Sequence, residues 1–93
     1  MDERIAQELI ALELARIREK PHSELVKFVG HPEHRVARTR DGKTYQLEVE
    51  AFWDNRKGGD VRVIVSADDG GLRAFVPVTD DFIKAPDGSF VGE

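Results

Sequence analysis

The second half of the chain alternates apolar and polar residues with a period of two, and short turn segments interrupt this alternation three times. Side chains of a β-strand point to opposite faces in turn, so the alternation predicts strands with one buried face. Asp41-Gly42 is a strong signal for a tight hairpin, and Asp- and Gly-rich runs cover 54–60 and 68–71. The sequence therefore predicts a four-stranded antiparallel meander, in which strand order along the sheet follows the chain. The expected strands are Val36–Arg40, Lys43–Trp53, Val61–Ala67 and Leu72–Val78.

The first twenty residues predict one long helix. From Asp2 to Lys20 the residues are good helix formers with no Gly or Pro, and Pro21 ends the run. Glu13 and Arg16 interrupt the apolar face, so we expect its edges to remain partly exposed. The apolar residues of this face cover an arc of roughly 200° and are Ile5, Ala6, Leu9, Ile10, Leu12, Leu14 and Ile17.

The segment from His22 to Gly30 has two interpretations. Ser23 is a suitable N-cap and Gly30 a suitable C-terminal stop, which favours a short second helix. The β-branched Val26 and Val29 would equally suit a short strand.

Length and composition predict one domain with a modest core. We expect a single α+β domain over residues 1–93, with a helical part at 1–30, an antiparallel sheet at 35–79 and a structured tail at 80–93. The chain has no cysteine, so a disulfide framework and a thiolate zinc site are excluded, and we expect a cytoplasmic protein. Charged residues throughout the N-terminal segment argue against a signal peptide or a membrane span. A formal net charge of −4 disfavours nucleic-acid and anionic-membrane partners.

The turns also predict which strand residues share a face. With a two-residue loop at Asp41-Gly42, Val36 is opposite Leu47, and the N-terminal helix covers this face. The predicted core face consists of Val36, Tyr45, Leu47, Val49, Ala51, Trp53, Val61, Val63, Val65, Leu72, Ala74, Val76 and Val78.

Three large apolar residues fall on the opposite face of the predicted sheet. Phe52, Ile64 and Phe75 occupy successive strands, and the expected register places Phe52 opposite Ile64 and Ile64 opposite Phe75. An apolar row flanked by arginines is typical of contact surfaces. The candidate interaction surface is therefore Phe52, Arg62, Ile64, Arg73 and Phe75. Its cover is either a protein partner, such as a second copy in a homodimer, or the chain's own Phe82, Ile83, Phe90 and Val91.

No catalytic, cofactor or metal motif is complete, so we assign no catalytic residue, no cofactor and no metal ligand. Gly42-Lys43-Thr44 resembles the end of a phosphate-binding loop, but Ala37 stands where that motif needs glycine. The three histidines lie in loop segments without a third ligand at fixed spacing. The acidic residues mostly occupy expected turns, which their side chains stabilise.

Two further clusters give alternative hypotheses. Arg35, Arg38, Arg40 and Lys43 make the first hairpin basic, which suits either phosphate contacts or the protection of an edge strand from aggregation. Glu13, Tyr45 and Trp53 are candidates for a pocket between helix and sheet. The favoured function is a small non-enzymatic interaction or self-association module. The alternative is a small-ligand-binding protein or an enzyme that uses this pocket.

Overall fold

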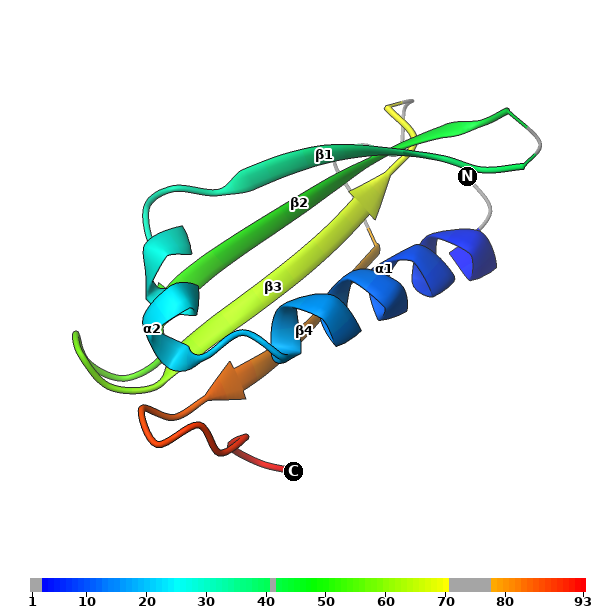
Figure 1. Cartoon of the computed structure of the whole chain (residues 1–93). Helices are drawn as coiled ribbons and strands as arrows, with labels where there is room; N and C mark the ends of the chain where they lie inside the picture. Colours follow the sequence, from blue (N-terminus) through cyan, green and yellow to red (C-terminus); the bar gives the residue numbers. More distant parts are fainter. Residues whose placement is uncertain (1–2, 41, 71–77) are drawn as a thin grey trace.

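The fold is a helix layer packed on one face of a four-stranded antiparallel sheet, as the sequence predicted (Figure 1). The structure is a computed structural model that describes residues 3–40, 42–70 and 78–93. Sheet order is β1-β2-β3-β4, so the expected meander is confirmed. The elements are α1 (Glu3–Arg18), α2 (His22–Leu25), a 3₁₀ turn η1 (Val26–Phe28), β1 (Glu33–Arg38), β2 (Thr44–Trp53), β3 (Val61–Asp68) and β4 (Val78–Lys84).

Helix α1 lies across β3 and β4 and leaves β1 at the open side of the sheet (Figure 1). The centre of its predicted apolar arc is buried, with Ala6, Ile10 and Ile17 almost without solvent contact. Leu12, at the edge of the arc, has 71% of its surface exposed. Glu13 is instead only 6% exposed. The helix is therefore oriented so that Glu13, rather than Leu12, lies on its buried side.

The segment after Pro21 combines both interpretations of its sequence. It forms α2 and the 3₁₀ turn, which confirms the short second helix, and Leu25 is completely buried beneath it. Val29 then makes a single parallel bridge with Ala51 at the end of this segment. Helix α2 places Leu25 in the core, and the Val29–Ala51 bridge fixes the position from which the chain continues to β1.

The first hairpin differs from the prediction by one residue. The amide of Thr39 donates to the carbonyl of Lys43, so three residues, not two, lie between the residues that close the loop. Gly42 has φ of +83°, the left-handed conformation that completes a three-residue hairpin loop. Arg35 is therefore opposite Leu47 on the core face, and Val36 is opposite Gln46 on the outer face. The prediction that Val36 belongs to the core was wrong, because one extra loop residue reverses every side chain of β1.

The two other strand pairs also differ from the expected register. Phe52 is opposite Arg62, not Ile64, which is a shift of two residues that keeps every side chain on its predicted face. Ile64 is opposite Asp81 on β4, and Phe75, its expected partner, lies outside the described residues. β4 extends to Lys84, five residues beyond the expected end of the sheet at residue 79. The expected strand Leu72–Val78 lies, apart from Val78, outside the described residues.

The core lies between α1 and the inner face of the sheet. Every second residue of β3 is fully buried, and Tyr45, Leu47, Val49 and Ala51 of β2 continue this face. Full burial of a valine or leucine side chain contributes about 1.5–3 kcal/mol, so these rows dominate the stability of the fold. From β4, Phe82 enters the same core opposite Val63.

The C-terminal tail lies on the helix side of the sheet, and not over the outer face. Phe90 forms a bridge with Lys84 and packs edge-to-face on Phe82, with ring centroids 5.8 Å apart. The Arg18 guanidinium lies 3.8 Å from the centre of the Phe90 ring and also binds the Glu93 carboxylate. Buried Lys84 donates its ammonium hydrogens to the carbonyls of Arg18 and Lys20, at 2.9 and 2.8 Å. The tail therefore closes the C-terminal end of α1. The alternative cover of the outer face consisted of Phe82, Ile83, Phe90 and Val91. Phe82 and Phe90 lie on the helix side, so this alternative was wrong for them, whereas Ile83 belongs to β4.

Candidate interaction surface

The outer face of the sheet carries an apolar cluster that surrounds one arginine. We define the outer cluster as Phe52, Ile64 and Ile83. Phe52 and Ile83 are the two cross-strand neighbours of Arg62, and Ile64 is two residues further along β3. Phe52 is 48% exposed, and the two isoleucines are partly exposed. Neighbours on one face of a sheet lie about 5–8 Å apart, so these side chains form one contiguous surface.

Two carboxylates hold Arg62 at the centre of this cluster. Its Nε donates to Oδ1 of Asp54 at 3.2 Å, and Nη1 donates to Asp81 on β4. The hydrogen bond to Asp81 is the main cause that raises the pKa of Arg62 above its usual value. The guanidinium is therefore presented to solvent in a defined orientation between Phe52 and Ile83.

An acidic pair borders the outer cluster on β2. Glu48 and Glu50 share the outer face, and His34 Nε2 lies 2.5 Å from the Glu48 carboxylate. The pKa of Glu50 is raised, first by its hydrogen bond with Glu48, then by partial burial and the Glu48 charge. The surface thus combines an apolar centre, an oriented arginine and an acidic border.

The sequence prediction identified part of this surface. Phe52, Arg62 and Ile64 lie on the outer face as expected, whereas Arg73 and Phe75 lie outside the described residues. Ile83 was assigned to the tail and not to the sheet. β4 has no apolar–polar alternation, because Thr79, Asp80 and Asp81 follow one another and are all exposed, so the period-two pattern could not identify this strand.

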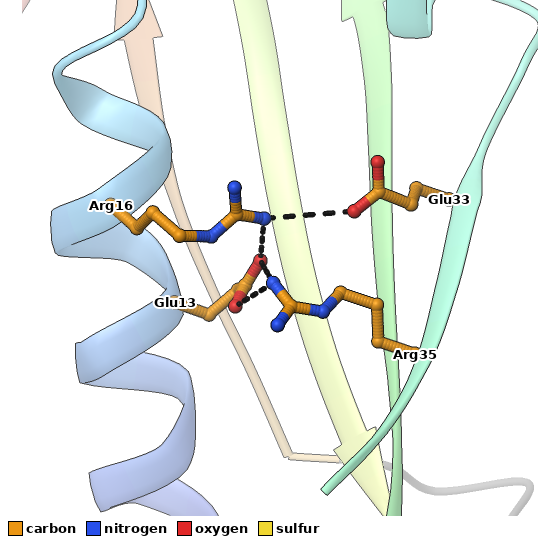
Figure 2. A network of polar contacts seen from close by, with 4 residues as sticks. All are labelled: Glu13, Arg16, Glu33 and Arg35. Carbon is orange, nitrogen blue, oxygen red and sulfur yellow. Dashed lines mark hydrogen bonds and ion pairs between the residues drawn. The ribbon is translucent and has the colours of Figure 1, made fainter.

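The three residues predicted to line a pocket are separated in the structure. The Glu13 carboxylate accepts hydrogen bonds from Arg35 at 3.1 Å and from Arg16 at 2.5 Å, and Arg16 also contacts Glu33 (Figure 2). This network connects α1 to β1. Tyr45 and Trp53 are eight residues apart on β2, which corresponds to about 26 Å along the strand.

Tyr45 and Trp53 have different surroundings. Tyr45 is 1% exposed, and its hydroxyl has no hydrogen-bond partner within the part of the chain that the structure describes. Trp53 lies beside His22, with ring centroids 6.3 Å apart, and His22 Nε2 is 2.7 Å from the carbonyl oxygen of Gly59. Trp53 therefore belongs to the contact between α2 and the β2–β3 loop.

Two surface hollows formed by described residues lie elsewhere. One of about 260 Å³ separates α1 from the start of β4, and its lining includes Gln7, Ile10 and Asp80. Another of about 280 Å³ is formed by the β2–β3 loop and Pro86. Neither is lined by Glu13, Tyr45 or Trp53.

Arg35 and Arg38 lie on opposite faces of β1, so the basic hairpin residues do not all share one patch. Arg35 points to Glu13 on the helix side (Figure 2), whereas Arg38 lies on the outer face and is exposed. Within residues 3–40, 42–70 and 78–93, no three His, Cys, Asp or Glu side chains are grouped to hold a metal ion. The described helices include none that is both long and apolar enough to cross a membrane.

Comparison with known proteins adds no relative: no family model matches the chain, and neither the curated proteins nor the solved structures contain a significant match.

Proposed function

We propose that this domain is a non-enzymatic protein-interaction module that contacts its partner through the outer sheet face. The observation that carries the proposal is Phe52, a large aromatic residue that is 48% exposed near the C-terminal end of β2. An aromatic anchor beside an oriented arginine, with aliphatic neighbours and a charged border, is the typical composition of binding hot spots. The partner is another protein or a second copy of the chain.

The substitution Phe52→Asp tests the proposal. Phe52 contributes little to the core, so the variant should fold, with a loss of stability of about 1 kcal/mol. It should lose the partner that the wild-type protein retains, or show a lower mass by sedimentation if the partner is a second copy.

Leu12→Asp is the matched control, because Leu12 is also a large exposed apolar residue but lies on the helix. The proposal requires that Leu12→Asp behaves like the wild-type protein and that Phe52→Asp does not. Equal behaviour of the two variants would contradict a role for the outer cluster. Unfolding of Phe52→Asp would show instead that Phe52 belongs to the core.

A small-ligand site between helix and sheet is the second candidate, and the buried Tyr45 hydroxyl is the observation that favours it. A buried hydroxyl without a partner costs free energy, which a polar atom of a ligand would recover. Compounds found by an NMR screen should then lose affinity for a folded Tyr45→Phe variant. Compounds that bind both proteins equally would contradict this site.

A further inference from the structure

Strand β1 forms one edge of the sheet, and its backbone is oriented to accept another strand (Figure 1). The Thr39 amide points toward β2, because it donates to Lys43 at 2.9 Å. Backbone groups of an antiparallel strand point to alternate sides. The N–H and C=O groups of His34, Val36 and Arg38 therefore point away from β2, toward the open edge.

The exposed side chains of this edge define what a neighbouring strand would meet. Val36, in the middle of β1, is 65% exposed on the outer face. Arg38 follows two residues later on the same face and is exposed. His34, two residues before Val36, already lies against Glu48. The edge thus offers one apolar side chain, Val36, and one cation, Arg38, which lie two residues apart on the same face of β1.

The opposite side of β1 keeps the edge in place. Arg35 binds the buried Glu13 carboxylate, and Arg16 of α1 contacts Glu33, so two consecutive inner-face residues of β1 are tied to the helix (Figure 2). An edge strand held in its final conformation loses less entropy when another strand is added.

We propose that the open edge of β1 accepts an extended segment of a partner protein as an additional strand, with an aliphatic side chain against Val36 and a carboxylate against Arg38. Backbone hydrogen bonds to His34, Val36 and Arg38 supply affinity, and the two side-chain contacts supply specificity. A second copy of β1 suits this edge poorly, because the register with Val36 opposite Val36 places no carboxylate against Arg38. The proposal uses other residues than the outer cluster and does not depend on it.

The probe is a blocked peptide, Val-Thr-Glu-Thr-Val-Thr-Glu-Thr-Val, whose pattern is the same in both chain directions. Its central valine can therefore meet Val36, with a glutamate at Arg38, in a parallel or an antiparallel arrangement. NMR hydrogen exchange should show new protection of the His34, Val36 and Arg38 amides in the complex, with less change at Arg35 and Ala37. The matched probe has lysine in place of both glutamates.

Charge exchange tests the assignment of Arg38. Arg38→Glu should weaken binding of the glutamate peptide about tenfold and improve binding of the lysine peptide by a similar factor. Phe52→Asp should leave both affinities unchanged, so failure of this proposal is separable from failure of the outer-cluster proposal.

Four results would overturn the proposal. The first is that the peptide adds no protection to the three amides, and the second is that the wild-type protein binds both peptides equally. The third is that changes in hydrogen exchange are confined to other residues. The fourth is that protection of these amides rises with protein concentration in the absence of peptide. The last result would assign the edge to a second copy.

Discussion

At the scale of single residues, Tyr45 carries a polar hydroxyl group at a core position where only its aromatic ring contributes to packing. The ring is part of the buried core on the inner face of β2, whereas the hydroxyl has no hydrogen-bond partner among the described residues. We predict that Tyr45→Phe leaves the free energy of unfolding unchanged or raises it by up to about 1 kcal/mol, because no hydrogen bond is lost. Urea denaturation of both proteins measures this difference.

Tyr45→Leu is the control for this experiment, because it removes ring volume as well as the hydroxyl. It should destabilise the protein by about 1–3 kcal/mol. A loss of more than about 1 kcal/mol in Tyr45→Phe would contradict the prediction and show that the hydroxyl has a partner, such as a buried water.

At the scale of elements, the first hairpin shows how one loop residue controls a whole strand. Gly42 has φ of +83°, and a Cβ placed on it would have no atom within 4 Å. The cost of a side chain there is therefore conformational and not steric. We predict that Gly42→Ala destabilises the protein by about 1–2 kcal/mol. D-Alanine, introduced at this position by chemical synthesis, should be neutral or stabilising, because it favours positive φ.

Thermal unfolding of the two Gly42 variants beside the wild-type protein measures this contrast. Equal destabilisation by both alanine enantiomers would show that the loop does not need the left-handed conformation, and it would contradict the observed register of β1.

The same hairpin explains which parts of the fold could be predicted from the sequence. The alternation of β2 and β3 predicted their side-chain faces, because an error of two residues in the loop leaves faces unchanged. Val36 was misplaced because Asp41-Gly42 fits both a two-residue and a three-residue loop, and only the structure distinguishes them. Ile83 was missed for a different reason: Asp80 and Asp81 resemble a turn, although they lie in an edge strand.

Glu13 shows why contacts between different elements are also hard to predict from the sequence. Helical periodicity placed it within the apolar arc but did not identify a partner, because the expected first strand began at Val36 and left Arg35 outside the sheet. The one-residue change in the hairpin moves Arg35 to the helix side, where it binds Glu13. A buried contact between distant segments thus depended on the conformation of one loop.

At the scale of the whole molecule, folding shifts the pKa values of acidic groups in two opposite directions. Arg18 lowers the pKa of Glu93 through a hydrogen bond, and Ser89 lowers that of Asp87 in the same way. Both contributions favour the folded state above the unfolded pKa values and disappear as pH falls through the folded ones. The pKa of Glu50 shifts in the opposite direction, because it is raised, mainly by the hydrogen bond with Glu48. Its favourable contribution is present below its unfolded pKa and is lost as pH rises through the folded value.

We therefore predict that Glu50→Gln increases stability at pH 7 and not in acid. At neutral pH the substitution removes repulsion between Glu48 and Glu50, which is worth roughly 0.2–1 kcal/mol for a like-charge pair on a sheet. At a pH below the ordinary glutamate value of 4.5, the wild-type side chain is itself protonated, so the difference should disappear. Urea unfolding at both pH values measures this change, and Gln46→Glu, which adds a like charge beside Glu48 on the same face, should have the opposite effect at pH 7. A stabilisation of Glu50→Gln that is equal at both pH values would contradict the pairing of the two carboxyl groups, because a proton-linked effect must follow the titration of Glu50.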